Sequence, residues 1–153
     1  MSQVSQADDA LLTKTANTVF GRKGELASLA VMPRPRRVFA MIYSAQGTID
    51  NGGFQYFFEA DWPERPPYST FSDSYRAIGA TDVANWLDQA AAMFPFAEPH
   101  LHRSERVKYL REFCVKGDSP MGMLSGEAID ASARVFTRLA EYVRLNSGHF
   151  KRS

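Results

Sequence analysis

Apolar residues recur at helical spacing along most of the chain. Four stretches carry an apolar side chain every three or four residues, which is the spacing of one buried helix face. The four stripes are Leu12, Ala16, Val19 and Phe20; Val38, Met41, Ile42, Ala45 and Ile49; Val83, Trp86, Leu87, Ala90, Ala91 and Phe94; and Ile129, Ala133, Phe136, Leu139, Ala140 and Val143. No run shows the strict alternation, rich in Val, Ile and Thr, that is typical of strands. The pattern predicts an all-α fold, a single compact multi-helix domain of about six to eight helices.

Glycines and prolines divide these helical stretches. Gly79 is placed to end a short helix that holds Phe71, Tyr75 and Ile78, because glycine readily adopts the left-handed conformation found after helix ends. Residues 117–126, with several glycines, are expected to form a loop before the last long helix. No linker or repeat interrupts the chain, so residues 1–153 are predicted to be one domain with a frayed tail at 147–153.

Length and composition exclude several classes of protein. A single cysteine among 153 residues rules out an internal disulfide and a four-cysteine zinc site. The uncharged stretch at 38–49 has twelve residues, whereas a membrane-spanning helix needs about eighteen or more. The first residues lack the basic and then apolar layout of a secretory signal. We therefore expect a soluble, cytoplasmic domain.

The net charge of +1 conceals an uneven layout. Residues 50–98 contain eight acidic and two basic side chains, a net charge of −6, while both flanking regions are basic. Segregated charge can steer a charged partner, although the two signs can also intermix once the chain folds. If the acidic stretch forms a surface, its candidate partner-binding residues are Asp61, Glu64, Asp73, Asp82 and Asp88.

The stretch from Thr48 to Phe58, Thr-Ile-Asp-Asn-Gly-Gly-Phe-Gln-Tyr-Phe-Phe, combines a turn signal with an aromatic face. Paired glycines allow positive φ, and the Asp50 or Asn51 side chain is a candidate cap for the following helix. Eight of the nineteen aromatic residues lie within Phe54–Tyr75. Two interpretations stay open: the rings form the central core while the glycines let two helices approach, or some of them line a recognition groove.

This motif resembles the DUF4375 family of DMP19-like DNA-mimic proteins. In that family an Asn-Gly-Gly-Phe segment with paired aromatics precedes an Ile-Gly-Ala element. The matching positions here are Asn51, Gly52, Gly53, Phe54, Gln55, Phe57, Phe58, Ile78, Gly79 and Ala80. The resemblance implies an all-helical fold, a bacterial origin, no catalytic apparatus and a protein partner such as a transcription regulator, with a homodimer left open. DNA mimicry needs many carboxylates spaced like phosphates, and this near-neutral chain departs from that picture.

Residue types that carry catalysis are sparse. His100 and His102 flank Leu101 in a proline-bounded loop, but a metal site needs three or four converging ligands. Cys114 falls on the apolar side of its helix, which is typical of a packed thiol. Since no nucleophile elbow, phosphate-binding loop or zinc-binding helix motif occurs, we expect no enzyme activity, no metal and no cofactor.

The leading hypothesis is a non-enzymatic domain, regulatory in character, that binds another protein through the acidic, aromatic-bearing region 50–98. The alternative is direct nucleic-acid binding through two basic clusters, in which phosphates would contact the arginines and lysine. These clusters are Arg34, Arg36 and Arg37, and Arg103, Arg106, Lys108 and Arg111. Because acidic residues interrupt the second cluster and the isoelectric point is near 7.9, nucleic-acid binding is the less favoured alternative.

Overall fold

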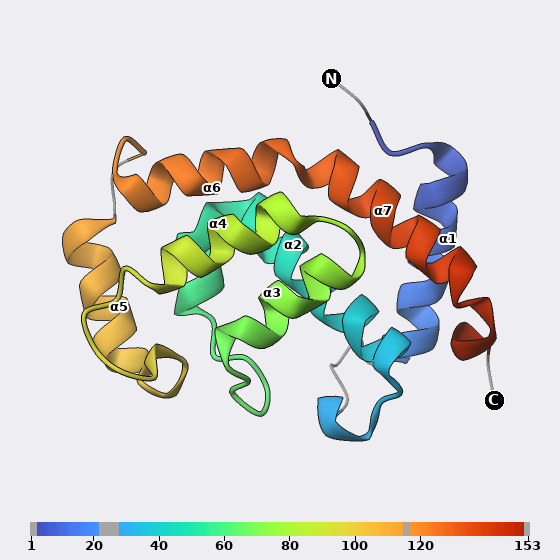
Figure 1. The fold of residues 1–153 in the computed structure, drawn as a ribbon, viewed down its shortest axis with the longest axis horizontal. Coiled ribbons are helices and arrows are strands. Elements are labelled where there is room, and N and C mark those ends of the chain that lie inside the picture. Colours follow the sequence, from blue (N-terminus) through green and yellow to red (C-terminus); the bar gives the residue numbers. More distant parts are fainter. Residues whose placement is uncertain (1–2, 22–27, 115–116, 152–153) are drawn as a thin grey trace.

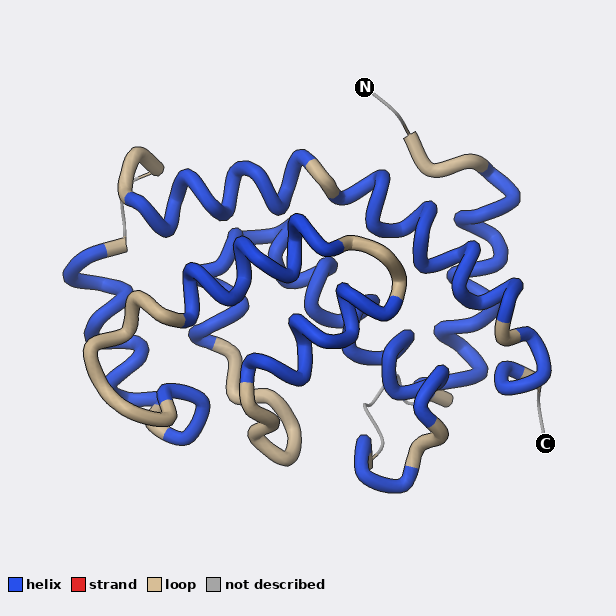
Figure 2. The backbone as a smooth tube through the Cα atoms, viewed as in Figure 1, coloured by secondary structure: helices blue, strands red, loops and turns tan. Residues whose placement is uncertain are grey.

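The computed structural model describes residues 3–21, 28–114 and 117–151, and these are helical with no strand (Figures 1 and 2). The all-α prediction is confirmed. The α-helices are α1 (Gln6–Phe20), α2 (Arg34–Glu59), α3 (Tyr68–Ala77), α4 (Thr81–Ala91), α5 (Arg103–Phe113), α6 (Pro120–Asp130) and α7 (Ser132–Leu145), and the short 3-10 helices are η1 (Leu29–Val31), η2 (Pro99–Leu101) and η3 (Ser147–Phe150). None of these helices is both long and apolar enough to cross a bilayer.

Helix α2 is the central element of the fold. It packs against α1, α3, α5, α6 and α7, and the antiparallel pair α3 and α4 lies over one side of it (Figure 1). Helices α6 and α7 follow one another along one edge of the molecule, with α5 at one end and α1 at the other (Figure 1). Helix α2 is therefore the scaffold against which most of the other α-helices are positioned.

Helix α2 is kinked at the two glycines of the motif. Gly52 and Gly53 have non-helical backbone angles, and Gly53 has a φ of +70°, a conformation that residues with a Cβ rarely adopt. The Tyr56 ring lies 2.1 Å from where a Cβ on Gly52 would stand. The Phe54 N–H, freed by the kink, donates to the Ser125 hydroxyl of α6 at 2.9 Å. The cap thus comes from α6 and not from Asp50 or Asn51, as the sequence had suggested.

The aromatic residues that follow the kink form the core. Phe54, Phe57 and Phe58 are fully buried, and the Phe57 ring lies 5.0 Å from that of Phe71 on α3. The Phe58 ring lies 5.0 Å from that of Phe94, beyond α4. Edge-to-face contacts at such distances add to the free energy gained by burial. Of the two interpretations of the motif, the core interpretation holds for these three rings.

A polar network, buried at Gln46 and Tyr75 and exposed at Asp50, joins α2 to three other helices. The Gln46 amide donates to Asp50 at 2.9 Å and to the Ala128 carbonyl of α6 at 3.1 Å. The Tyr75 hydroxyl of α3 donates to the Gln46 carbonyl oxygen at 2.9 Å, and Ser132 of α7 donates to Asp50 at 2.6 Å. Burial, and secondarily the Asp50 charge, raises the pKa of Tyr75 far above its usual range. Tyr75 therefore stays a neutral donor.

Gly79 ends α3 as predicted. It has a φ of +83°, and its N–H donates to the Arg76 carbonyl at 3.0 Å. The Ala80 N–H donates to the Tyr75 carbonyl at 2.9 Å. This pair of bonds defines a Schellman motif, which satisfies carbonyls at a helix end. The Ile-Gly-Ala element of the family motif therefore terminates helix α3.

Besides the cap, two further sequence expectations differ from the structure, one about residues 117–126 and one about the tail. Residues 117–126 do not form one loop, because α6 begins at Pro120 with Ser119 as its N-cap, accepting the Gly122 N–H at 3.0 Å. Proline at the first helical position and a serine cap are favourable there, and buried Met121 packs the helix on the core.

The tail is also more ordered than expected over residues 147–151. Arg36 donates to the carbonyls of His149 and Lys151 at 2.7 and 2.9 Å. The Phe150 ring lies 5.9 Å from that of Phe39. These contacts tie η3 to α2, so this part of the predicted frayed tail is held in place.

Candidate functional site

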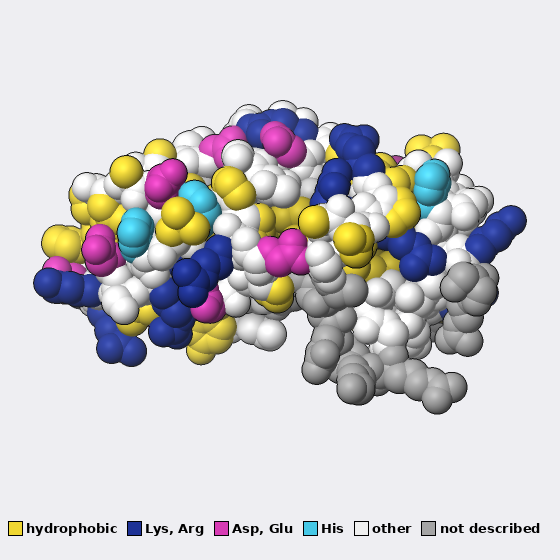
Figure 3. All heavy atoms as spheres, turned by 90° about the horizontal axis from the view of Figure 1, so that it is seen from below, with side chains coloured by type: hydrophobic (Ala, Val, Ile, Leu, Met, Phe, Trp, Pro, Cys, Tyr) yellow, Lys and Arg dark blue, Asp and Glu magenta, His cyan; other side chains and the backbone are white. Residues whose placement is uncertain are grey.

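Four of the five acidic candidates pair with arginines of the same chain. Arg65 lies 3.7 Å from Asp61, and the fifth candidate, Glu64, accepts the Leu29 N–H at 3.0 Å. The remaining ion-pair distances are 3.5 Å for Asp73 with Arg76, 2.6 Å for Asp88 with Arg76 and 2.6 Å for Asp82 with Arg134. On the face seen in Figure 3, acidic side chains stand among basic ones.

Arg76 contacts two of these carboxylates, Asp73 on its own helix α3 and Asp88 on α4. Its guanidinium donates to Asp88 at 2.6 Å and to the Asn85 side chain at 3.2 Å. The hydrogen bond with Asp88 is the main reason that the pKa of Arg76 is raised. Asp88 also accepts a short hydrogen bond from Ser72. Asp88 therefore helps to hold α3 and α4 together, whereas the contact of Asp73 with Arg76 lies within α3.

Asp82 has a comparable role at the start of α4. Partial burial acts to raise the pKa of its carboxyl, but hydrogen bonds from Arg134 and from the Val83 N–H outweigh that effect and lower it. The Arg134 contact comes from α7 and measures 2.6 Å. Asp82 thus stays ionised and links α4 to α7.

Two arginines of the second basic cluster, Arg103 and Arg106, form hydrogen bonds with the C-terminal end of α2. Arg106 is 1% exposed and donates to the carbonyls of Phe58 at 2.7 Å, Pro99 at 2.7 Å and Ala60 at 3.2 Å. Arg103 donates to the Glu59 carbonyl at 3.1 Å. The last carbonyls of a helix lack partners within the helix and carry partial negative charge. These two arginines supply those partners.

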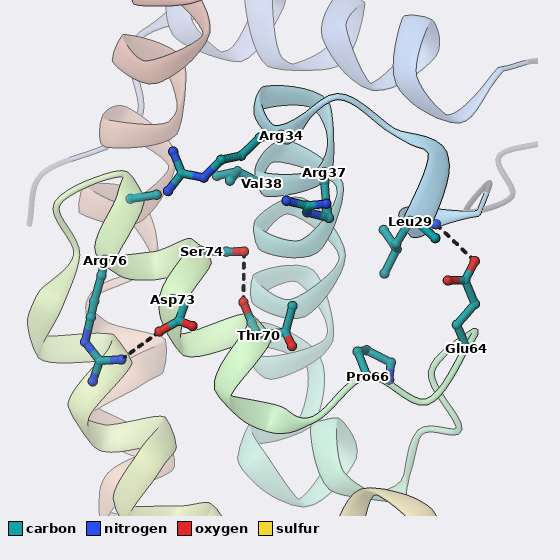
Figure 4. Close-up of a pocket in the computed structure, with 12 residues that line it drawn as sticks. Leu29, Arg34, Arg37, Val38, Glu64, Pro66, Thr70, Asp73, Ser74 and Arg76 are labelled. Atoms are coloured by element: carbon teal, nitrogen blue, oxygen red, sulfur yellow. Dashed lines mark hydrogen bonds and ion pairs between the residues drawn. The ribbon is translucent and has the colours of Figure 1, made fainter.

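Arg34 and Arg37 of the first basic cluster line a groove, whereas Arg36 binds the tail. A depression of about 820 Å³ opens between η1, the start of α2 and α3 (Figure 4). Its apolar lining is Leu29, Ala30, Val38, Pro66 and Ala77, and its polar lining is Arg34, Arg37, Glu64, Thr70, Asp73, Ser74 and Arg76. Figure 4 shows Arg34 extending from the start of α2 toward the end of α3, with Arg37 drawn between it and Leu29.

Arg34 and Arg37 differ from the other groove charges in their surroundings. Within the described parts of the chain, neither forms an ion pair with a carboxylate, whereas Arg76 across the groove contacts two. Burial raises the pKa of Tyr142 on α7, and the charges of Arg34 and Arg37 partly oppose that rise. The two guanidiniums therefore carry positive charge that no described carboxylate compensates through an ion pair.

The histidines do not assemble a site. Among residues 3–21, 28–114 and 117–151, no three His, Cys, Asp or Glu side chains are placed to hold a metal ion. The His100 ring lies beside Tyr68, at 6.2 Å, and the His102 ring lies beside Phe96, at 6.4 Å. Burial raises the pKa of the Cys114 thiol, which favours its neutral, unreactive form.

Sequence patterns identified only part of the groove. They singled out the cluster of Arg34, Arg36 and Arg37, and they singled out Glu64 and Asp73. They did not indicate Thr70 and Ser74, which lie with Asp73 on the opposite wall, or the η1 residues. These residues come together only because of the way α3 crosses α2. The run of Pro63, Pro66 and Pro67 was the available signal, since it forces an irregular connection that leaves space beside the start of α3.

The fold and site define a small helical domain with a groove of mixed charge. The family model described as DMP19-like protein matches residues 30–146. Because this match covers more than half of the chain, the chain belongs to the DMP19-like protein family. The match begins after α1 and ends just beyond α7, so it includes the kinked helix and all groove residues except Leu29. No curated protein and no solved structure matches the chain.

Proposed function

We propose that this protein is a non-enzymatic protein-interaction domain that binds its partner in the groove between α2 and α3. The observation that carries the proposal is the pair Arg34 and Arg37, whose charges line the groove without an ion-pair partner in the described residues. Arginine is enriched in protein interfaces, because its planar fork binds carboxylates in two places and its stem packs on apolar surface.

The composition of the groove supports a protein ligand. Apolar Ala30, Pro66 and Ala77, which are not buried, lie among charged and hydroxyl groups, and protein interfaces likewise combine apolar and polar groups.

The proposal keeps part of the acidic region as a contact surface. Glu64 and Asp73 line the groove, and Asp73 is 75% exposed at its side chain. DNA mimicry over the whole surface has weaker support, because the net charge is +1 and most acidic candidates are paired. The resemblance to DNA-mimic proteins makes a transcription regulator the first class of partner to examine, and a second copy of the chain the next.

Site-specific photo-cross-linking in cells of the source organism examines the proposal. A photoreactive residue is placed at Ala30 or Thr70, which line the groove from opposite walls, and at Thr13, an exposed position on α1, as a control. We expect the same discrete protein adduct from both groove positions and none from Thr13. Absence of an adduct at both groove positions would falsify the proposed function.

Direct nucleic-acid binding through Arg34 and Arg37 is the second candidate, favoured by the same two guanidiniums, which have no ion-pair partner among the described residues. It has fewer arginines available than the sequence suggested, since Arg36, Arg103 and Arg106 donate to backbone carbonyls. Binding of fluorescent duplex DNA, measured at low and at moderate salt, addresses this candidate. Phosphate binding weakens steeply with salt, so undetectable binding even at low salt removes it.

A further inference from the structure

We infer that the groove is built to receive an acidic segment of a partner protein, with carboxylates on Arg34 and Arg37 and an apolar side chain between the groove walls. This inference rests on the proposed function and adds the chemistry of the partner. The sequence predicts that this protein contacts its partner through acidic side chains. In the groove, by contrast, basic side chains of this protein contact acidic side chains of the partner.

The spacing of the two arginines defines how the partner's charges are placed. Arg34 and Arg37 are three residues apart on α2, so their Cβ atoms are separated by about 5–6 Å on one side of the helix. Two carboxylates one helical turn apart on a partner have a similar spacing. Each guanidinium can bind a carboxylate through two parallel hydrogen bonds, which are stronger than hydrogen bonds between neutral groups.

The electrostatic surroundings favour anions at this end of the groove only. Arg76, at the opposite wall, is held by Asp73 and Asp88, so its charge is already compensated. No acidic residue lies in the first turn of α2, and no carboxylate of the described residues forms an ion pair with Arg34 or Arg37. A ligand anion is therefore drawn to the α2 wall and away from the carboxylates of the α3 wall.

Charge complementarity also selects a protein segment over duplex DNA. Duplex DNA carries one negative charge per about 1.7 Å of its axis, so a duplex along the groove would bring phosphates close to Asp73 and Glu64 as well as to the arginines. A peptide with a few spaced carboxylates avoids that repulsion. Its apolar side chains can contact Ala30, Pro66 and Ala77, apolar lining residues that are not buried and that a phosphate backbone cannot use.

A peptide titration tests the inference. The probe is a short fluorescein-labelled peptide of Glu and Leu, with Glu residues one helical turn apart; the same peptide with Gln for Glu is its control. Anisotropy is measured on the wild type, on the double variant Arg34→Gln with Arg37→Gln, and on Lys108→Gln with Arg111→Gln. The last pair also stands three residues apart on exposed helix positions and removes the same charge. Thermal unfolding of each variant is recorded alongside.

We expect the Glu peptide to bind the wild type more tightly than the Gln peptide. Binding should weaken by about tenfold or more in the Arg34/Arg37 variant and change little in the Lys108/Arg111 variant. An equal loss in both variants would show attraction to net charge alone and would overturn the inference. So would tighter binding of duplex DNA at the same arginines, or no binding of the Glu peptide to the wild type.

Cross-linking repeated in an extract of the same cells, to which the peptide can be added, separates this inference from the proposed function. If the groove positions Ala30 and Thr70 give a discrete adduct that excess Glu peptide does not reduce, the groove binds a protein but not through an acidic segment. If neither position gives an adduct, the proposed function itself fails. Competition by the Glu peptide and not by the Gln peptide supports both.

Discussion

The two ends of α2 are both surrounded by arginines, which serve different purposes. At the C-terminal end, Arg103 and Arg106 donate to the carbonyls of Phe58, Glu59 and Ala60, and Trp62 donates to the Phe57 carbonyl at 3.0 Å. The last turn of α2 thus has a side-chain donor at each of four successive carbonyls. At the N-terminal end, Arg34 and Arg37 face a groove and no ion pair compensates them within the described residues.

The difference shows that a basic cluster does not by itself indicate a binding surface. A guanidinium next to helical carbonyls is a structural cap, favoured by the partial negative charge of the helix end. A guanidinium beside the positive end of a helix gains nothing from the helix and remains available for an external anion. Substitutions at the two ends should therefore separate stability from binding.

The largest effect is expected at the structural end. Replacing Arg106 with Ala leaves buried carbonyls without a donor, and we expect the free energy of unfolding to fall by about 3 kcal/mol. Arg106→Lys should give an intermediate loss, since lysine keeps the charge but not the fork. Urea denaturation measures both. Arg111→Ala, at an exposed position on the same helix, should change stability by less than about 0.5 kcal/mol; an equal loss there would contradict the structural role of Arg106.

The kink between the two ends gives the next largest effect. Gly53→Ala places a Cβ 2.8 Å from the Ser125 side chain at a φ of +70°, and we expect a loss of about 2 kcal/mol in urea denaturation. Gly47→Ala is the matched control, because it lies in the same helix with nothing within 4 Å of its Cβ position. That variant should be more stable than the wild type by about 0.5–1 kcal/mol. A harmless Gly53→Ala would mean that the kink is not required.

An exposed ion pair should contribute less, and in a pH-dependent way. Arg134→Gln removes the partner that lowers the pKa of Asp82 below its ordinary value of 3.8. A lowered folded-state pKa stabilises the fold above the unfolded-state pKa, and that contribution is lost as the pH falls through the folded-state value. Because both side chains are more than a third exposed, we expect only about 0.5 kcal/mol at pH 7. Urea denaturation near pH 3 should show a smaller difference, and a pH-independent loss would assign Arg134 another role.

The smallest effect on stability is expected at the groove. Arg34→Ala and Arg37→Ala should each change the free energy of unfolding by less than about 0.5 kcal/mol, because no ion pair with a described residue is lost. Thermal and urea denaturation measure this directly. A loss comparable to that of Arg106→Ala would remove the contrast between the two ends.

Local patterns were sufficient to predict most of the fold. Helical periodicity identified the cores of α1, α2, α4 and α7, and Gly79 marked the end of α3. Helix α6 was missed because its sequence contains Gly122 and Gly126, which lower helix propensity. Its stability comes from the Ser119 cap and from packing against α2, and contacts between distant segments have no local sequence signal.

Contacts between distant segments also determine which polar and charged groups are paired, and local sequence patterns do not predict them. Ser125 caps Phe54 from 71 residues away, and Arg106 reaches Phe58 across 48. In the sequence, Arg106 is one of several basic residues on a short helix, and nothing local distinguishes it from exposed Arg111. Composition located the acidic stretch at 50–98, but it did not predict the pairing of Asp82 with Arg134, which brings together residues 52 positions apart. Composition gives the number of charges, and only the tertiary fold determines which of them are compensated.

The most direct measurement of the central claim is the ratio of two dissociation constants for the Glu and Leu peptide, taken at one salt concentration. The numerator is the value for the Arg34→Gln and Arg37→Gln double variant, and the denominator is that for the Lys108→Gln and Arg111→Gln double variant of equal net charge. We predict a ratio of about ten or more, with both variants folded as stably as the wild type. A ratio near one would contradict the assignment of the α2–α3 groove as the binding surface.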